Sequence, residues 1–435
     1  MSDILHPSLI GLDDVLYTST SPSVSNKSPF DTLPTELITQ IFSYTTNSTP
    51  ISLHSMPEIW TLAHVSARWR SVVCNIPWIW SNIEIDVDQS ASKNDSSMEI
   101  LDAYLTRSYN RPLHVSIKRS IRLALVDQSP TSSKALQRYL SRLLPHAERL
   151  EFISVHGLFS DELALFEPMR GRLASLKSLE LYIHHEPQND HMEPNDVFLS
   201  APSLSHIKLS GTHLEGSHPM LELPWGQLRS YHGCRPNLLA ASDLEECIIS
   251  CRCGTLGELR HDRLESLSIP SPDPLRQASL PQLKQLNVKL MSSEDILLVT
   301  QFLRSEPLSL QHLTLTGRFQ SSAQTMTAPL RDLFSAPGAS DIRGLNWDVS
   351  EGIHAVCSLL TAPSNEQRCL LPKLEELTVR SSASIEGEAM LMGMVTSRFG
   401  KTKGPSDVTV RARARSNAQA QEGIRKVEGV RWNTV

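Results

Sequence analysis

The chain has 435 residues, of which 40% are hydrophobic and 20% charged, and its formal net charge is -6 at pH 7. At about 150 residues per domain, this length accommodates two or three domains. The apolar fraction excludes a fully disordered chain, and the acidic balance excludes a generally basic nucleic-acid-binding protein.

Three features predict a cytoplasmic or nuclear protein without a membrane segment. No run approaches the roughly 18 to 20 apolar residues that a membrane-spanning helix needs. The opening MSDILHPSLIGLDD carries acids where a secretory signal would carry Lys or Arg. Seven cysteines without a framework of paired spacings indicate reduced thiols.

Composition divides the chain into four segments. Residues 1–28 are rich in Ser, Thr and Pro, which predicts a disordered tail. Residues 29–88 form a separate block, residues 89–395 a repetitive one, and residues 396–435 a basic end. The last 40 residues carry nine Lys/Arg against three Asp/Glu, so their net charge is +6 and that of the rest is -12. Arg411, Arg413 and Arg415 alternate, which predicts one face of a final strand, either a protective edge or a site for an acidic or nucleic-acid partner.

The block 29–88 predicts a small helical domain. In TELITQIFSY the apolar residues recur at helical spacing, and Pro34 stands at the helix start, where its missing N–H is harmless. A second helical run extends from Ile59 to Ile76, and IPWIW and a strand-like alternation follow it. A block this short would be marginally stable alone, so we expect it to dock on a partner.

The segment 89–395 contains a degenerate repeat, a six-residue frame with apolar residues at its first, fourth and sixth places. Nine of ten frames are apolar at all three places, and the exception has Gly233 at its sixth. Most spacings between frames lie in or near 20 to 29 residues, and amphipathic helices separate several frames. The frames start at Ala147, Leu176, Leu204, Leu228, Leu244, Leu264, Leu283, Leu310, Ile342 and Leu374.

These patterns predict an α/β protein, with an all-helical N-terminal domain followed by an irregular solenoid. Strand alternation places the third, fifth and seventh residues of each frame on the face opposite the core. That face is polar, with both charges, and Tyr182 lies at a seventh place near Glu180 and Lys208. We expect these three residues to contribute to cargo binding; the alternative is an ordinary solvated face.

The block from Leu33 to Trp80 resembles the F-box, in the form common in large families of fungal proteins. The resemblance rests on LPTELITQIF, then VSARWRSVV, then IPWIWSNIEI, with Ser66 where Cys is frequent. The remainder is similar to the degenerate leucine-rich repeats that usually follow an F-box. No frame has Asn or Cys at its ninth place, so the usual buried Asn ladder is not expected.

The resemblance implies the substrate-receptor subunit of a Skp–cullin–F-box-type ubiquitin ligase, a monomer within that complex. The F-box would bind a Skp-type adaptor and through it a cullin, and the solenoid would recruit a protein substrate. A scaffold acting outside any ligase is the alternative. Seven residues would face or support the adaptor: Leu33, Pro34, Leu37, Ile41, Leu62, Val65 and Trp69.

No pattern argues for catalysis, a cofactor or a metal. Cys247, Cys251 and Cys253 could supply zinc ligands together with Cys234 and His261, but their spacing matches no common closed site. Histidines and acids cluster in a Pro/Asn-rich stretch from His184 to His191, where we expect a solvated loop. GMVTSRFGKT has six residues between its glycines where a phosphate-binding loop needs four.

Overall fold

The computed structural model describes most of the chain between residues 32 and 432. The described ranges are 32–46, 51–52, 58–90, 96–119, 130–184, 195–212, 221–251, 259–305, 308–317, 323–349, 352–361, 369–379, 390–391, 393–394, 397, 408–412 and 430–432. The predicted disordered tail, Arg413 and Arg415 lie outside them. The chain forms two compact units, residues 1–48 with 58–76 (unit 1) and residues 49–57 with 77–435 (unit 2).

Unit 1 is helical, as its apolar periodicity predicts. Its helices are α1 (Thr35–Thr46), α2 (Glu58–Val65) and α3 (Ala67–Cys74). The predicted second helix is thus two helices separated at Ser66. The Ser66 side chain accepts a hydrogen bond from the Trp69 backbone N–H at 3.1 Å, because a serine at this position satisfies a free donor of the first turn. The serine that departs from the common F-box pattern therefore starts α3.

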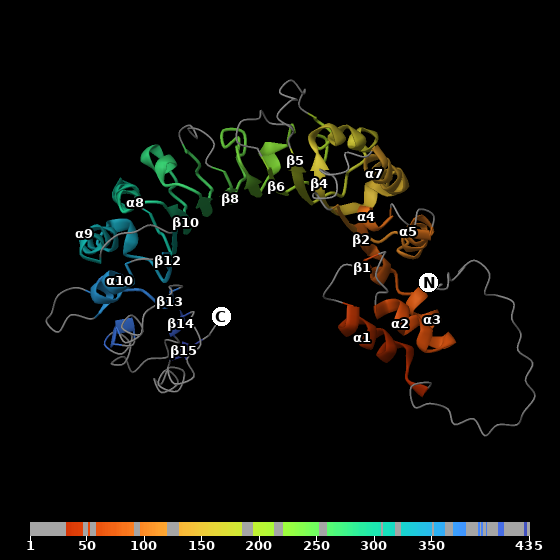
Figure 1. The fold of residues 1–435 in the computed structure, drawn as a ribbon, viewed down its shortest axis with the longest axis horizontal. Coiled ribbons are helices and arrows are strands. Elements are labelled where there is room, and N and C mark those ends of the chain that lie inside the picture. Colours follow the sequence, from red (N-terminus) through yellow and green to blue (C-terminus); the bar gives the residue numbers. More distant parts are fainter. Residues whose placement is uncertain are drawn as a thin grey trace, which may run out of the picture. The chain divides into compact units, whose positions relative to one another are not determined.

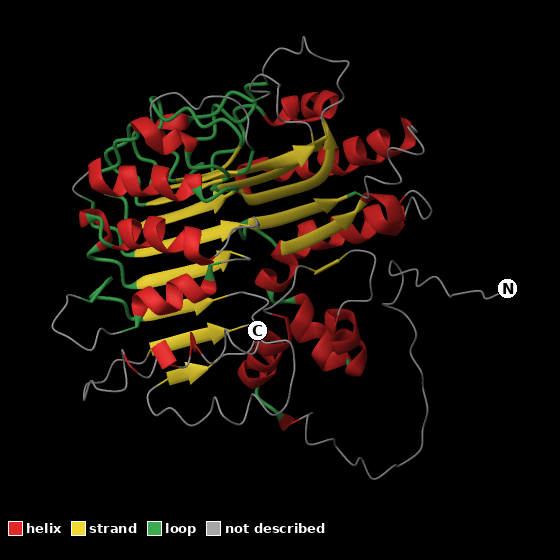
Figure 2. Cartoon of the chain, turned by 60° about the vertical axis from the view of Figure 1, so that its left-hand side comes forward, coloured by secondary structure: helices red, strands yellow, loops and turns green. Residues whose placement is uncertain are grey.

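Unit 2 is built on one sheet, which has 15 strands in the described residues, all parallel and in sequence order. Figure 2 shows the strands side by side. They are β1 (Ile51–Ser52), β2 (Asn82–Asp86), β3 (Leu113–Lys118), β4 (Leu150–Phe159), β5 (Ser178–His184), β6 (His206–Thr212), β7 (Ser230–Gly233), β8 (Glu246–Ile249), β9 (Ser266–Ile269), β10 (Gln285–Leu290), β11 (His312–Gly317), β12 (Gly344–Val349), β13 (Glu376–Val379), β14 (Val408–Ala412) and β15 (Val430–Trp432).

Helices cover one face of this sheet, and we call the other face the open face (Figure 1). The core lies between the sheet and the helices, because each unit buries its apolar side chains only against its neighbours. None of the described helices is long and apolar enough to cross a bilayer. The α-helices are α4 (Val87–Ser90), α5 (Ser96–Arg107), α7 (Pro130–Leu143), α8 (Glu294–Ser305), α9 (Ala323–Phe334) and α10 (Ile353–Leu360). The 3-10 helices are η2 (Pro77–Ser81), η3 (Leu144–Arg149), η4 (Ser160–Met169), η5 (Trp225–Gln227), η6 (Asp273–Gln277) and η7 (Pro337–Ala339).

The strand register confirms nine of the ten predicted frames. The residue at the fourth place of each of these frames is in register with the fourth-place residue on the next strand. The series begins with Leu179 opposite Ile207 and ends with Leu345 opposite Leu377. The first places of these nine frames are also buried, from Leu176 to Leu374. Parallel strands with one covered face therefore follow the apolar alternation of the sequence.

The frame predicted to start at Ala147 is wrong by three residues. The register shifts between Leu113 and His114, which pair with Leu150 and Phe152, so Glu151 is an extra residue in β4. The residue in register with Glu180 is consequently Ser154, not Glu151. A bulge of one residue reverses the faces of all side chains that follow it, which apolar spacing alone does not reveal.

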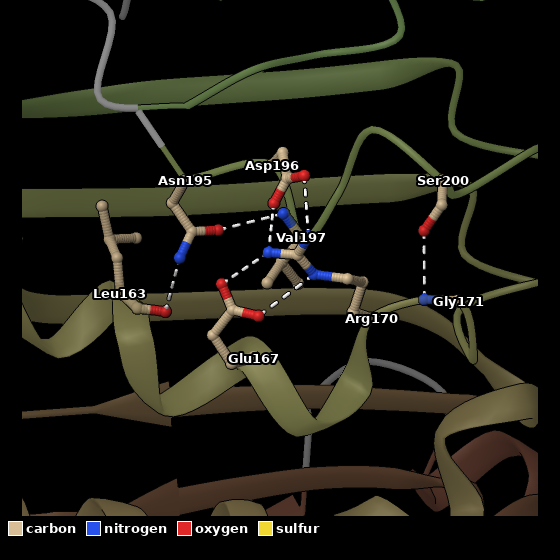
Figure 3. Close-up of polar contacts among 8 residues, drawn as sticks. All are labelled: Leu163, Glu167, Arg170, Gly171, Asn195, Asp196, Val197 and Ser200. Atoms are coloured by element: carbon tan, nitrogen blue, oxygen red, sulfur yellow. Dashed lines mark hydrogen bonds and ion pairs between the residues drawn. The ribbon is translucent and has the colours of Figure 1, made fainter. Parts of the chain in front are cut away.

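Individual polar side chains join neighbouring repeat units in place of an Asn ladder. Figure 3 shows one such set, in which Asn195 Nδ2 donates to Leu163 O at 3.3 Å and Asn195 Oδ1 accepts from the Val197 N–H at 3.0 Å. In the same set, Arg170 bridges two carboxylates, Glu167 on its own turn and Asp196 on the next unit. The hydrogen bond with Glu167 is the main reason that the pKa of Arg170 is raised.

Gln227 and His261 have the same role further along unit 2. Gln227 Nε2 donates to Ala201 O at 2.6 Å and to Leu204 O at 3.0 Å. His261 Nε2 lies 2.6 Å from Ala241 O and therefore donates to it, while His261 Nδ1 accepts from the Arg263 N–H. These three connections are each stabilised by a different side chain, which fits the irregular solenoid that the sequence predicts.

Both β1 and β2 come from the block that the sequence assigns to the helical domain. Ile51 and Ser52 pair with Ile83 and Glu84, and β2 continues the sheet into β3. The segment that interrupts α1 and α2 thus contributes the first strand of unit 2. The predicted boundary between residues 88 and 89 differs from this division into compact units, which places residues 49–57 and 77–88 with the sheet.

Candidate functional site

Helix α1 of unit 1 carries apolar side chains on two faces. Ile38 and Phe42 are fully buried, whereas the exposed fractions of Leu37 and Tyr44 are 45% and 76%. Leu37, Ile41 and Tyr44 are four and three residues apart, so they lie along one side of the helix. We call these three residues the α1 stripe. An apolar side of a helix that is left in solvent is typical of a protein-binding surface.

The start of α1 is held by hydrogen bonds that leave its side chains available. Arg68 Nη2 of α3 donates to the Leu33 carbonyl, and the Pro34 carbonyl accepts from the Leu37 N–H at 3.1 Å. Leu33 is half-buried and Pro34 is exposed. The backbone of this segment is thereby fixed, while Pro34 faces solvent.

The other predicted adaptor residues divide into surface and core. Val65, at the end of α2, is 57% exposed, and Leu62 is half-buried. Trp69 is only 7% exposed, and its ring contacts Phe42 edge-on with centroids 5.3 Å apart. Trp69 therefore packs in the core against α1. Sequence reasoning missed Tyr44, although it lies seven residues after Leu37 on the same side of α1.

On the open face of unit 2, the three predicted cargo residues lie together. Glu180 and Lys208 are in register on β5 and β6, and Lys208 Nζ is 3.9 Å from Glu180 Oε2. Tyr182 stacks on His156 of β4, with ring centroids 6.4 Å apart and planes 13° apart. Sequence reasoning missed His156, because the slipped frame placed the wrong residues of β4 on this face.

The described cysteines and histidines do not form a metal site. Cys247 occupies a fourth place in the core, where it is fully buried, and both ring nitrogens of His261 are engaged in hydrogen bonds. Among the described residues, no group of three His, Cys, Asp or Glu could hold a metal ion. Cys253 and most of the cluster after His184 lie outside them, and His184 itself is a buried residue of β5 where a loop was predicted.

The core position of Cys247 predicts an ordered pattern of thiol reactivity. Burial raises the pKa of Cys247 to about 12 and that of Cys357 to about 11, so neither is a thiolate at pH 8. Cys74 and Cys369 are free thiols at half-buried positions. In native protein, we expect maleimide labelling followed by mass spectrometry to modify Cys74 and Cys369 well before Cys247 and Cys357. Fast labelling of Cys247 would contradict the register of β8.

Unit 1 has the features of a small helical docking domain: three short helices, a fixed entry to α1 and an apolar side left in solvent. Residues 30–86, about an eighth of the chain, match the family model described as F-box-like. The chain therefore carries an F-box-like domain. No curated protein matches the chain. F-box proteins are typically non-catalytic adaptors of ubiquitin ligase complexes, and an F-box implies binding to a Skp-type adaptor.

Proposed function

We propose that this protein is the substrate-receptor subunit of a Skp–cullin–F-box-type ubiquitin ligase, of the form found in fungi. Unit 1 binds the Skp-type adaptor, and unit 2 is a degenerate leucine-rich-repeat solenoid that recruits a protein substrate. The observation that carries the proposal is the α1 stripe on a domain that matches the F-box-like model. A solvated helix would carry polar side chains at these positions.

The adaptor surface combines Leu33 and Pro34 with the α1 stripe and Val65. Leu62 is half-buried, and Trp69 packs against Phe42 of α1 in the core. Apolar anchors of this kind dominate the energetics of protein contacts, because they are withdrawn completely from water. A docking domain this small also gains stability from its partner.

Replacement of Leu33 and Pro34 together by alanine tests the proposal. We expect the double variant to lose co-purification with a co-expressed Skp-type adaptor, because both side chains belong to the predicted contact surface. The far-UV circular dichroism and the melting temperature of unit 2 should not change. Ser71→Ala, an exposed position on α3, is the control. Undiminished recovery of the adaptor with the double variant would exclude this surface.

The cargo surface is proposed on the open face at Glu180, Tyr182 and Lys208. A triple alanine variant should weaken recovery of the substrate in pull-down experiments. It should lower the melting temperature by only a few degrees, since surface substitutions usually cost less than about 0.5 kcal/mol each. Thr314→Ala, at the matching row of β11, is the control. Full retention of cargo by the triple variant would place the site elsewhere, for instance on the basic C-terminal segment.

A ligase-independent scaffold would use unit 2 in the same way but would not require the adaptor. The two functions therefore differ only at unit 1. Adaptor binding by the wild-type chain, and its loss with Leu33 and Pro34, would favour the ligase.

A further inference from the structure

Aromatic and imidazole rings gather on one part of the open face. Every strand from β3 to β7 contributes at least one ring to this face, whereas in the described part of β9–β13 His312 is the one ring on it. The rings belong to His114, Phe152, His156, Phe159, Tyr182, His184, His206 and His232. The rings of Tyr182 and His184 are also neighbours, with centroids 5.1 Å apart and planes tilted by 55°.

Four of these rings border a strip of small side chains. His114 and Phe152 are neighbours with centroids 6.0 Å apart, and His156 and Tyr182 are stacked neighbours. The two pairs lie four residues apart along β4, about 13 Å, and Ser154 lies midway between them. Ser116 of β3 is in register with Ser154, which is only 3% exposed. We call the two serines and the four rings the ring strip.

The two serines of the ring strip are flanked on both sides by a carboxylate on the next strand. Glu84 of β2 is in register with Ser116, and Glu180 of β5 is in register with Ser154. Lys118 Nζ binds Glu84 Oε2 at 2.7 Å, whereas the contact between Lys208 and Glu180 is loose at 3.9 Å. Glu180 can therefore accept hydrogen bonds from an incoming donor at little loss of existing contacts.

The negative net charge of the open face around the ring strip favours the binding of a cation. The described open face of β2–β8 carries five carboxylates against two ammonium groups, those of Lys118 and Lys208, and both lysines already have acidic neighbours. One of the five, Glu151, lies 4.0 Å from His114 Nε2 and is paired at 2.6 Å with Lys177, which directly precedes β5. Aromatic faces attract a cation within about 6 Å of the ring centroid. A guanidinium combines a planar face, which stacks on rings, with a fork of donors that matches a carboxylate. The carboxylates are Glu84, Asp86, Glu151, Glu180 and Glu246.

We propose that the ring strip binds an arginine side chain of an extended cargo segment. The guanidinium stacks against Tyr182 and donates to Glu180, and the serine strip accommodates the remainder of the side chain. This inference rests on the proposed function, since it specifies which cargo chemistry the receptor recognises. It extends the predicted cargo residues to His114, Ser116, Phe152, Ser154 and His156.

Fluorescence anisotropy with the full chain tests the proposal. The probes are fluorescein-labelled Gly/Ser decapeptides with two central arginines, and matched peptides with citrulline or glutamate in their place. We expect the arginine peptide to bind roughly 10-fold more tightly than the citrulline peptide. Tyr182→Leu, which keeps apolar area but removes the ring, and Glu180→Gln should each weaken the arginine peptide about 5-fold. Thr314→Ala should leave it unchanged.

Three results would overturn the inference: tightest binding of the glutamate peptide, equal affinity of both variants and wild type for the arginine peptide, or no binding of the arginine peptide. Circular dichroism of both variants shows whether the sheet is intact. Adaptor co-purification from the same preparations separates the two proposals. If the adaptor binds and no peptide does, the cargo chemistry is wrong; if the arginine peptide binds and the adaptor does not, the ligase role is wrong.

Discussion

Replacement of Arg119 by alanine is expected to lower the free energy of unfolding by about 3–5 kcal/mol, because it leaves a buried carboxylate without its partner. Arg119 and Glu162 are 3% and 4% exposed and form two parallel hydrogen bonds of 2.8 and 2.7 Å. The Phe159 N–H donates to Glu162 at 2.9 Å, and the Ser133 hydroxyl donates to it at 2.5 Å. Glu162 of η4 thus connects to the residue that follows β3, to β4 and to α7.

The backbone around this ion pair is shaped to fit it. Gly157 is the extra residue of a second bulge in β4, with φ +82°, and its carbonyl accepts from Arg119 Nε at 2.9 Å. A Cβ at Gly157 would lie 2.6 Å from the Arg119 carbonyl oxygen, so a larger residue cannot occupy this position unchanged. The arginine and the bulge therefore depend on each other.

Urea denaturation monitored by circular dichroism measures the effect of Arg119→Ala. Lys118→Ala is a matched control, since Lys118 is the preceding residue, has the same charge and also has an acidic partner, but is 52% exposed. It should cost less than about 1 kcal/mol. The double variant Arg119→Met, Glu162→Leu should recover much of the loss, because it removes both charges. Equal effects of Arg119→Ala and Lys118→Ala would show that the ion pair is not buried in solution.

Leu37→Glu is expected to weaken adaptor binding by roughly 100-fold, which corresponds to about 3 kcal/mol. Leu37 begins the α1 stripe, and docking would place the new carboxylate in an apolar contact without a partner. Its side chain is 45% exposed in the free protein, so the fold of unit 1 should tolerate the change. Titration calorimetry with the purified Skp-type adaptor measures the affinity.

Ser71→Glu is the control for Leu37→Glu. It introduces the same charge at an exposed position of α3 outside the predicted surface. We expect the affinity of this variant to equal that of the wild type. If both variants lost affinity equally, general charge repulsion would explain the result and the α1 stripe would not.

The sequence predicted the parts of the fold that depend on local apolar periodicity. The helical block, the parallel strands and the core residues of nine frames follow from alternation over a few residues. The frame at Ala147 failed because the bulge at Glu151 breaks that alternation. Helix α9 was missed because Pro329 lies inside it, although Met326, Leu330 and Leu333 are buried at helical spacing.

Features that depend on distant residues could not be predicted from the sequence. Arg119 and Glu162 are 43 residues apart, and in the sequence neither differs from an ordinary charged surface residue. The ring strip likewise combines residues of three strands that only the register brings together. On the candidate adaptor surface, the resemblance supplied the residues, and the structure distinguished exposed Leu37 and Val65 from buried Trp69.

The central claim is that unit 1 joins the chain to a ligase while unit 2 remains free to bind cargo. Deletion of residues 29–88 is unsuitable as a test, because it also removes β1 and β2 from the sheet of unit 2. Affinity purification of the tagged full chain, as wild type and as Leu37→Glu, with quantitative mass spectrometry, tests the claim most directly. We expect the wild type to recover a Skp-type adaptor and a cullin, and Leu37→Glu to lose both together while other partners remain. Recovery of other partners by the wild type without adaptor or cullin would contradict the account.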